Sequence, residues 1–261
     1  MSAPLLQLQD VHLSFRGIKA LQGVSLDIPE GEITAVIGPN GAGKTSLFNC
    51  ISGLYVPTQG QILFQGAPIS GQPPHLIARG GVARMFQNLA LFDHLTVLEN
   101  LLLGRHHLFR SRWWGDLFYS GQTRREEIAH RARVEEIIDF LDLESFRPFP
   151  VGILPYGVRK RVELGRALAM EPRLLLLDEP AAGLNTEETE DLARYVLDIK
   201  EELGITQILI EHDLHFVFDL ADSVAVLDFG TRVAHGAPAE VKNDPKVIEA
   251  YIGGSHMEIA S

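Results

Sequence analysis

The chain has 261 residues, of which 46% are hydrophobic and 22% charged, and its formal net charge is −11. This length favours one core with a sizeable insertion over two full domains. The acidic balance argues against a non-specific nucleic-acid-binding protein, because such a protein needs a positive surface. It leaves nucleotide binding open, since local backbone dipoles can hold phosphates on an acidic protein.

The cysteine count and the hydropathy pattern bear on the compartment. Cys50 is the single cysteine, so no internal disulfide can form, which suits a reducing compartment. We expect its thiol to be buried as a small apolar group. No apolar run approaches the roughly 18 residues of a membrane span, and the N-terminus lacks the basic region of a secretory signal. We therefore expect a cytoplasmic protein that reaches a membrane only through a partner.

The N-terminal part of the chain contains two kinds of predicted strand. Residues 33–38 are almost all apolar and predict a strand that is buried on both faces of a parallel sheet. A glycine-rich turn and a helix over 44–52 follow it. Other segments predict an antiparallel flank, the first of them alternating apolar and polar residues; they cover 5–15, 23–28 and 60–66.

The character of the sequence changes between residues 89 and 171. The segment 82–88 is the last predicted strand before this region, and no strand pattern interrupts the region itself. Within it, residues 126–141 predict an amphipathic helix, because four apolar residues recur at helical spacing. These residues are Val134, Ile137, Ile138 and Leu141.

Strands and helices alternate again after residue 172. The predicted strands cover 173–179, 205–212 and 223–228, and a tight turn at 228–230 leads into a last strand. Asn185 and Glu188 have the spacing of a capping box and predict the start of a helix over 187–203. Alternating strands and helices indicate a mostly parallel, three-layer α/β core. We expect this core to comprise residues 1–88 and 172–261, with 89–171 as a helical subdomain.

Residues 38–45, "GPNGAGKT", match a phosphate-binding loop between a buried strand and a helix. The glycines let consecutive backbone N–H groups point at phosphate oxygens, and the helix start adds its positive end. We expect Lys44 to bridge the β- and γ-phosphates of ATP and Thr45 to bind Mg²⁺. The residues expected to bind the nucleotide here are Asn40, Gly41, Ala42, Gly43, Lys44, Thr45 and Ser46.

Four leucines lead into Asp178 and Glu179, and ending a buried strand in two carboxylates is costly unless a cationic group meets them. We expect Asp178 to hold Mg²⁺, directly or through water. Strand alternation should turn Glu179 to the other face, where it can polarise a water for attack on the γ-phosphate. Gln87 ends another strand and can reach the metal or this water, although most such glutamines are solvated. A lone histidine is more often structural than functional. Only the place of His212 at the carboxyl end of a predicted strand favours a contact between His212 and the γ-phosphate.

Together these motifs resemble those of the ATP-binding subunits of ABC transporters over nearly the whole chain. The resemblance identifies "GPNGAGKT" as Walker A, "LLLLDE" as Walker B, "LPYGV" (154–158) as the signature and "AAGLN" (181–185) as the D-loop. It also makes Gln87 the Q-loop residue and His212 the switch histidine, and it places Phe15 where the family stacks an aromatic ring on adenine. The implied fold is a RecA-like P-loop core with an antiparallel β flank and an inserted helical subdomain.

The family implies that two subunits pack head to tail around two ATP molecules. Each signature helix would then present free N–H groups, near Tyr156 and Gly157, to the partner's γ-phosphate. The usual signature is Leu-Ser-Gly-Gly-Gln, and this chain departs from it at Pro155, Tyr156 and Val158. Pro-Tyr-Gly is similar to the branch of branched-chain amino acid importers, with urea and amide importers close by.

The resemblance also implies the partners. A second ABC ATPase, identical or different, completes the dimer, a membrane permease docks near Gln87, and a periplasmic solute-binding protein acts indirectly. The chain would lie on the inner face of the membrane. An ABC ATPase without transport is a second hypothesis, but this chain has one cassette, no heptad run and an acidic balance. A P-loop kinase or GTPase is a third, and the signature and D-loop argue against it.

Overall fold

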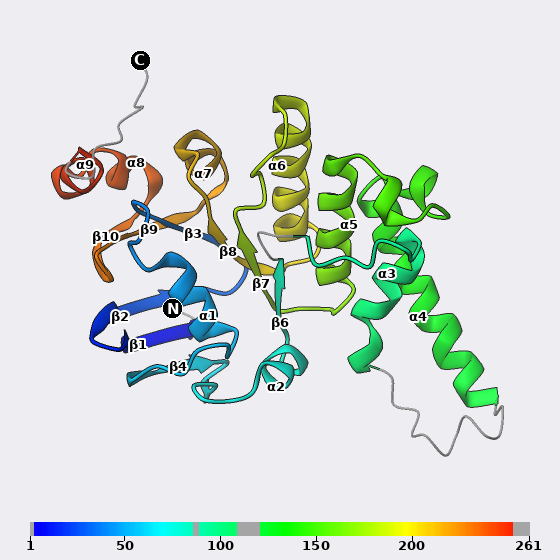
Figure 1. Ribbon diagram of the computed structural model, residues 1–261, viewed down its shortest axis with the longest axis horizontal. Coiled ribbons are helices and arrows are strands. Elements are labelled where there is room, and N and C mark those ends of the chain that lie inside the picture. The colour runs from blue at the N-terminus through cyan, green and yellow to red at the C-terminus, as the bar shows by residue number, and fades with distance from the viewer. Residues whose placement is uncertain (1–2, 86–88, 109–120, 253–261) are drawn as a thin grey trace.

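The computed structural model describes residues 3–85, 89–108 and 121–252. Two sheets form in the described part of the chain (Figure 1), and the larger is the central one. In chain order its strands are β3 (Ile33–Ile37), β6 (Val82–Met85), β7 (Leu174–Asp178), β8 (Thr206–Ile210), β9 (Ser223–Asp228) and β10 (Thr231–Gly236). Their spatial order is β10-β9-β3-β8-β7-β6, and all neighbours are parallel except β10 and β9.

The smaller sheet is antiparallel and has the spatial order β2-β1-β4-β5. Its strands are β1 (Leu6–Phe15), β2 (Ile18–Ile28), β4 (Gln59–Phe64) and β5 (Ala67–Pro68). The predicted flank is therefore confirmed. However, β2 begins five residues before its predicted start, because Arg16 and Gly17 take positive φ angles and close a tight hairpin directly after β1.

Helices cover both faces of the central sheet. The α-helices are α1 (Lys44–Ile51), α2 (Pro74–Arg79), α3 (Val97–Gly104), α4 (Gly121–Phe140), α5 (Tyr156–Leu168), α6 (Thr186–Glu201), α7 (Leu214–Leu220), α8 (Pro238–Lys242) and α9 (Pro245–Ile252). Short 3₁₀ helices lie at His106–Leu108, Glu144–Phe146 and Val151–Ile153. None of the helices within the described ranges is long and apolar enough to cross a bilayer.

The four leucines of β7 show how the layers are held together. Leu174 and Leu176 pack with α1 and the antiparallel sheet, whereas Leu175 and Leu177 pack with the helices on the opposite face. All four are fully buried, so the all-apolar run matches a strand enclosed on both faces. The result is the three-layer α/β arrangement that the sequence predicts.

Helices α3, α4 and α5 come from the segment predicted to be a helical insertion, and they lie beyond the β6 edge of the central sheet (Figure 1). The predicted apolar stripe of α4 is buried, as the exposure of Val134, Ile137 and Ile138 shows. The capping box at the start of α6 is confirmed by reciprocal bonds between Asn185 and Glu188. An equivalent box between Thr96 and Glu99 begins α3, which the sequence reading did not predict.

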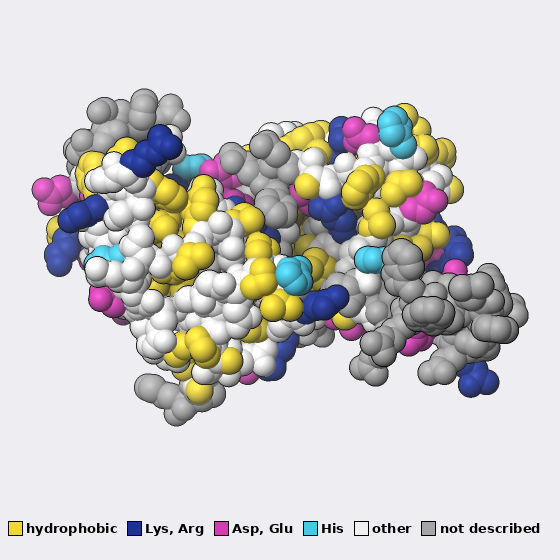
Figure 2. Space-filling view, turned by 60° about the horizontal axis from the view of Figure 1, so that its bottom comes forward, with side chains coloured by type: hydrophobic (Ala, Val, Ile, Leu, Met, Phe, Trp, Pro, Cys, Tyr) yellow, Lys and Arg dark blue, Asp and Glu magenta, His cyan; other side chains and the backbone are white. Residues whose placement is uncertain are grey.

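Charged side chains of both signs lie on the surface. On the face shown in Figure 2, Lys and Arg side chains are dispersed among apolar and acidic ones. The Lys and Arg side chains on this face therefore do not form a continuous basic surface.

Candidate nucleotide site

The strand order brings the predicted site residues to one edge of the central sheet. The phosphate loop follows β3, Asp178 and Glu179 lie at the end of β7, and His212 follows β8. These three strands are neighbours and run parallel, so their carboxyl ends meet. Gln87, which follows β6, lies outside the described residues.

The loop before α1 has the backbone that a phosphate cradle requires. Gly41 and Gly43 have φ angles of +82° and +105°, in the left-handed region that glycine adopts at low cost. Gly43 also lies against the β1–β2 hairpin, since a Cβ at this position would be 2.6 Å from the carbonyl oxygen of Ala20. Any larger residue at position 43 would therefore disrupt both the loop and its support.

Lys44 begins α1, and its side chain is folded back into this loop. Its ammonium donates to the carbonyl oxygens of Gly38 at 2.6 Å and Pro39 at 3.1 Å, and the residue is 6% exposed. Burial lowers the pKa of Lys44 below its ordinary value, while the carboxylates of Glu179 and Asp178 act in the opposite direction. The ammonium is thus bonded to the loop and interacts electrostatically with the predicted base, Glu179, and the predicted metal ligand, Asp178.

The other predicted loop residues differ in exposure. Ala42 is buried and donates its backbone N–H to the carbonyl of Pro39 at 3.1 Å. Asn40 and Thr45 are exposed, and Ser46 is half-buried. The hydroxyl-bearing and amide side chains are therefore open on the surface of the loop, where a ligand can reach them.

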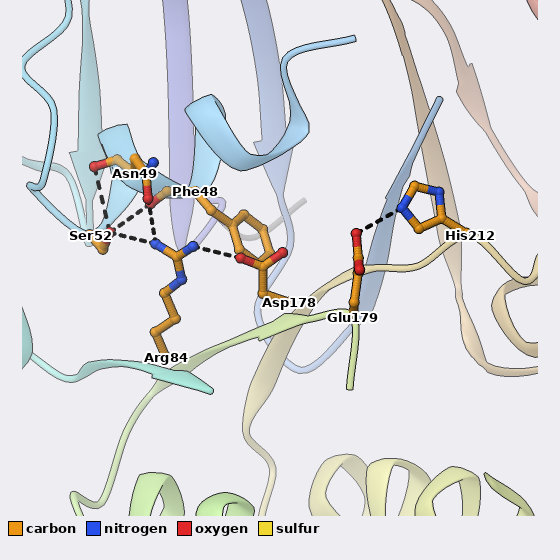
Figure 3. Close-up of polar contacts among 7 residues, drawn as sticks. All are labelled: Phe48, Asn49, Ser52, Arg84, Asp178, Glu179 and His212. Carbon is orange, nitrogen blue, oxygen red and sulfur yellow. Dashed lines mark hydrogen bonds and ion pairs between the residues drawn. The ribbon is translucent and has the colours of Figure 1, made fainter. Parts of the chain in front are cut away.

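Asp178 is held by an arginine in the strand next to it. The Nη2 of Arg84 donates to the Oδ2 of Asp178 at 2.6 Å, and the two side chains are 8% and 5% exposed. The Nη1 of Arg84 donates to Asn49 at 2.7 Å and to Ser52 at 3.3 Å, both at the end of α1 (Figure 3). The carboxylate predicted to hold a metal is thus buried and already paired with a cation.

Glu179 contacts His212, which the sequence had placed on a separate strand. Its Oε1 lies 2.7 Å from the Nε2 of His212 (Figure 3), and its side chain is 18% exposed. The predicted reason for its direction, strand alternation, is wrong. Strand β7 ends at Asp178, and a φ of +50° turns Glu179 out of the strand. The backbone N–H of Glu179 donates to the carbonyl oxygen of Ile210. A non-glycine residue in this conformation is strained, as is common in active sites.

Glu211, immediately before His212, connects two segments of the site. Its two carboxylate oxygens accept backbone N–H groups of Ala181 at 2.8 Å and of His212 at 3.1 Å. Burial raises the pKa of Glu211, and these two donors oppose the shift. The side chain therefore fixes the start of segment 181–185 relative to His212.

The N-terminus of α5 is open, as predicted. Pro155 is its N-cap with a φ of −54°, and no described side chain caps this end. The proline has no N–H to leave unpaired, and its carbonyl accepts the first helical bond, from Arg159 at 3.0 Å. The N–H groups of the first turn have no partner within the helix.

Tyr156 and Gly157 are packed against the segment that follows Glu179. The Oη of Tyr156 donates to the carbonyl of Ala182 at 3.3 Å. A Cβ on Gly157 would overlap the carboxylate of Glu188, which belongs to the capping box of α6. The absence of a side chain at position 157 therefore has a reason within this chain, in addition to the predicted approach of a phosphate.

The basic residues after Gly157 are used within the chain. Arg159 forms an ion pair with Asp93 at 2.8 Å, and Arg161 donates to the carbonyl of Leu141 at 3.3 Å. Lys160 is buried, with its ammonium 5.8 Å from the ring centroid of Tyr156. These side chains anchor α5, so the charge that an approaching anion meets is that of the helix end.

Phe15 lies at the end of β1, in the hairpin that supports the phosphate loop. Its ring is 41% exposed and meets Tyr55 edge-on, with centroids 5.0 Å apart. An open pocket of about 810 Å³ is lined by residues 38–42 of the loop, by His212 and by Tyr251 of α9. Its volume falls in the range of small-molecule sites.

Arg84 and Glu211 are site residues that sequence reasoning missed. Arg84 interrupts the apolar strand "VARM", and Glu211 directly follows the buried strand "TQILI". A charged residue in or at the end of a buried strand requires a partner. This signal indicates a partner, but Asp178, which pairs with Arg84, and Ala181, which donates to Glu211, are distant in sequence.

The fold and the site together define a P-loop nucleotide-binding protein of the three-layer α/β class. A sequence model described as "ABC transporter" matches residues 21–182, and one described as "Branched-chain amino acid ATP-binding cassette transporter" matches residues 231–257. The chain therefore belongs to the ABC transporter family as an ATP-binding subunit and is an ATPase of that family, which confirms the predicted family and fold class.

Individual relatives agree over nearly the full length. The high-affinity branched-chain amino acid transport ATP-binding protein BraF of Pseudomonas aeruginosa is 40% identical over 253 residues, or 97% of this chain and 99% of that protein. An ATP-binding cassette of an ABC transporter in its ADP conformation has a TM-score of 0.83 and 34% identity, covering 97% and 100%. A dimeric cassette in a post-hydrolysis state with ADP and Pi has a TM-score of 0.75 and 26% identity, covering 89% and 98%.

Proposed function

We propose that this chain is the ATP-hydrolysing subunit of an importer for branched-chain amino acids. The observation that carries the proposal is the match of residues 231–257 to the branched-chain amino acid cassette model, together with the 40% identity to BraF. The C-terminal match is specific to this branch, whereas the Walker motifs are common to the whole family. The Pro-Tyr-Gly signature supports the same assignment.

The phosphates of ATP would bind in the loop 40–46, with the adenine against Phe15. Lys44 would exchange its two carbonyl acceptors, Gly38 and Pro39, for β- and γ-phosphate oxygens. The positive end of α1 adds to this attraction. These contacts fix the triphosphate in front of Glu179.

The residues also suit Mg²⁺. Thr45 offers a hydroxyl and Asp178 a carboxylate, and these hard oxygen donors match the ion. The described residues contain no cluster of three or more His, Cys, Asp or Glu side chains around one point. When bound, the ion neutralises phosphate charge; Thr45, Asp178 and Gln87 are the residues that would hold it.

Glu179 would accept the proton of the attacking water. A carboxylate at the γ-phosphate can act as a general base, and His212 is already bonded to it at 2.7 Å. His212 would hold Glu179 in position in the ATP-free protein and contact the γ-phosphate in the bound one. Gln87 would help to orient the water from the end of β6.

A second ABC ATPase subunit would complete each site. The related cassette that is dimeric with ADP and Pi supports this assembly. The uncapped N-terminus of α5, with Tyr156 and Gly157, would bind the γ-phosphate held by the partner. The hydrogen bond from Tyr156 to Ala182 would then couple the signature to the D-loop of the same chain.

We further propose that the helical subdomain, residues 89–171, and the nearby Gln87 of this chain form the surface that docks on the permease subunits. Residues 1–88 and 172–261 would hold the nucleotide. The chain would lie on the cytoplasmic, inner face of the membrane, and a periplasmic solute-binding protein would act through the permease. The names of the relatives, which are ATP-binding proteins of transport systems, support this arrangement.

Transport of radiolabelled leucine tests the solute. The chain, its permease and the solute-binding protein are reconstituted in vesicles with ATP on the side of this chain. We expect ATP-dependent leucine uptake that isoleucine and valine inhibit and urea does not. Uptake of urea or a short amide, with no leucine uptake, would assign the chain to the neighbouring branch instead.

Cys50 provides a test of nucleotide binding. Burial in α1 raises the pKa of its thiol to about 12, so only about one thiol in 10,000 is ionised at pH 8. Because thiolate is the reactive form, we expect alkylation of the native protein to require unfolding. ATP at 100 times its Kd should slow alkylation about 100-fold, since it stabilises the folded state by about 2.7 kcal/mol.

The alkylation rate is measured by mass spectrometry with ATP and, as control, with an equal concentration of inorganic phosphate. A native rate equal to that of the denatured protein would contradict the burial of Cys50. A rate that ATP does not change would contradict the coupling of α1 to the nucleotide.

A further inference from the structure

Arg84 lies in the four-residue strand β6, where the other three residues are apolar, and its side chain is only 8% exposed. Placing a guanidinium in such a strand is costly unless it is fully paired. The guanidinium of Arg84 donates hydrogen bonds to the carboxylate of Asp178 and to the side chains of Asn49 and Ser52 at the end of α1. Its charged group also lies 5.6 Å from the ring centroid of Phe48.

These contacts connect the two elements that carry the expected metal ligands. Thr45 lies in the first turn of α1, and Asp178 lies at the end of β7 on an adjacent strand. The planar fork of Arg84 bonds Asn49 through one nitrogen, at 2.7 Å, and Asp178 through the other, at 2.6 Å. An arginine can make both bonds at once in a fixed plane, whereas the single ammonium of a lysine cannot.

The contact with Arg84 uses one of the two carboxylate oxygens of Asp178. Arg84 occupies Oδ2, and the second carboxylate oxygen lies on the side away from Arg84 (Figure 3). A residue that hydrogen-bonds to a metal-binding side chain affects metal affinity, because it orients that side chain before the metal arrives. A buried ion pair is, by contrast, weak support for a purely stabilising role, since apolar residues of similar volume often serve as well.

We propose that Arg84 is a positioning residue for the Mg²⁺ half of the nucleotide site. It fixes the carboxylate of Asp178 and the helix that carries Thr45 relative to each other, so that both ligands are in place when the metal–nucleotide complex binds. This inference rests on the proposed function. A fixed cation beside a metal ligand also repels the metal. If Arg84 positions Asp178, its removal should weaken Mg²⁺ binding, and if Arg84 competes with the metal, its removal should strengthen Mg²⁺ binding.

The test measures how much Mg²⁺ strengthens nucleotide binding. The Kd of a non-hydrolysable ATP analogue is determined by calorimetry with excess Mg²⁺ and with EDTA. The Kd in EDTA divided by the Kd in Mg²⁺ is then compared between variants. For Arg84→Met we expect this ratio to fall about 10- to 100-fold, because losing the partner of a ligand costs about that much metal affinity. The Kd in EDTA should change little, since the phosphate loop keeps its own contacts.

Two further variants separate positioning from folding. Arg84→Lys retains the charge beside Asp178 without the fork, and Asn49→Ala retains the ion pair but removes one contact to α1. Both should lower the ratio by less than Arg84→Met does, and they carry the test if Arg84→Met does not fold. The matched control is Arg173→Met, which removes a surface arginine, paired with Glu30 at 2.6 Å, just before the start of β7. Its ratio should equal that of the wild type.

Three outcomes overturn the proposal: an unchanged ratio in folded Arg84 variants, equal weakening with and without Mg²⁺, or a ratio that rises because Arg84 competes with the metal. A wild-type ratio of one would instead refute the Mg²⁺ site of the proposed function. The failure of the inference is thus distinguishable from the failure of the function on which it rests.

Discussion

Glu179→Gln is expected to abolish steady-state ATP hydrolysis, lowering turnover by at least about 100-fold, while ATP binding persists. The amide cannot accept the proton of the attacking water, but it has nearly the shape of the carboxylate. Removing one negative charge beside the triphosphate also relieves repulsion, so ATP-bound dimers should accumulate. Phosphate release gives the turnover, and light scattering after size-exclusion chromatography with ATP gives the mass.

The control for this variant is Glu202→Gln, which makes the same change at an exposed position at the end of α6. It should hydrolyse ATP like the wild type and remain in the same monomer–dimer equilibrium. Wild-type turnover by Glu179→Gln would refute the assignment of Glu179 as the base. An inactive variant that stays monomeric with ATP would refute a site shared between two copies of this chain, leaving a different ATPase as the partner and Glu179 as the base.

Lys44→Ala is expected to weaken ATP binding about 10- to 100-fold. A charge-assisted hydrogen bond contributes about 1.5–3 kcal/mol, and each 1.4 kcal/mol is a tenfold change in Kd. In the ATP-free protein the Lys44 ammonium bonds two loop carbonyls, so the alanine variant loses these bonds as well. It also loses the cation that faces Asp178 and Glu179. Calorimetry with ATP and Mg²⁺ gives the affinity.

Thermal unfolding without nucleotide separates the loss of binding from the loss of folding. The comparison is Lys200→Ala, which removes a lysine that bonds Asp222 at 2.6 Å near the end of α6. That variant should bind ATP with wild-type affinity. If folded Lys44→Ala bound ATP nearly as tightly as the wild type, Lys44 would not be a phosphate ligand.

Most of the architecture could be predicted because its signals are local. The all-apolar run 174–177 identifies a strand buried on both faces, and the Asn185–Glu188 pair marks the start of α6 within one residue. By contrast, the start of β2 depended on a hairpin at Arg16 and Gly17, and positive φ angles at such residues follow from packing as much as from residue type. Element boundaries were therefore less accurate than element types.

The candidate site was predictable as a set of residues but not as an arrangement. Lys44 begins the helix after the phosphate loop, and Asp178, Glu179 and His212 lie at or just beyond the strand ends where the pattern placed them. The sequence could not give the contact between Glu179 and His212, because the two residues are 33 positions apart and the segment between them must first fold into α6 and β8. Nor could it give the reason for Gly157, which is the carboxylate of Glu188 on another helix.

By itself, the sequence determined the type of chemistry: a phosphate loop, two carboxylates at the end of a buried strand and an uncapped helix start follow from residue types at short spacings. Only the tertiary structure decided which charges meet. Arg84 and Asp178 are 94 residues apart, and they pair because β6 and β7 are adjacent and parallel in the sheet. Strand order is a long-range property, and a buried charge reveals that it needs a partner without revealing which one.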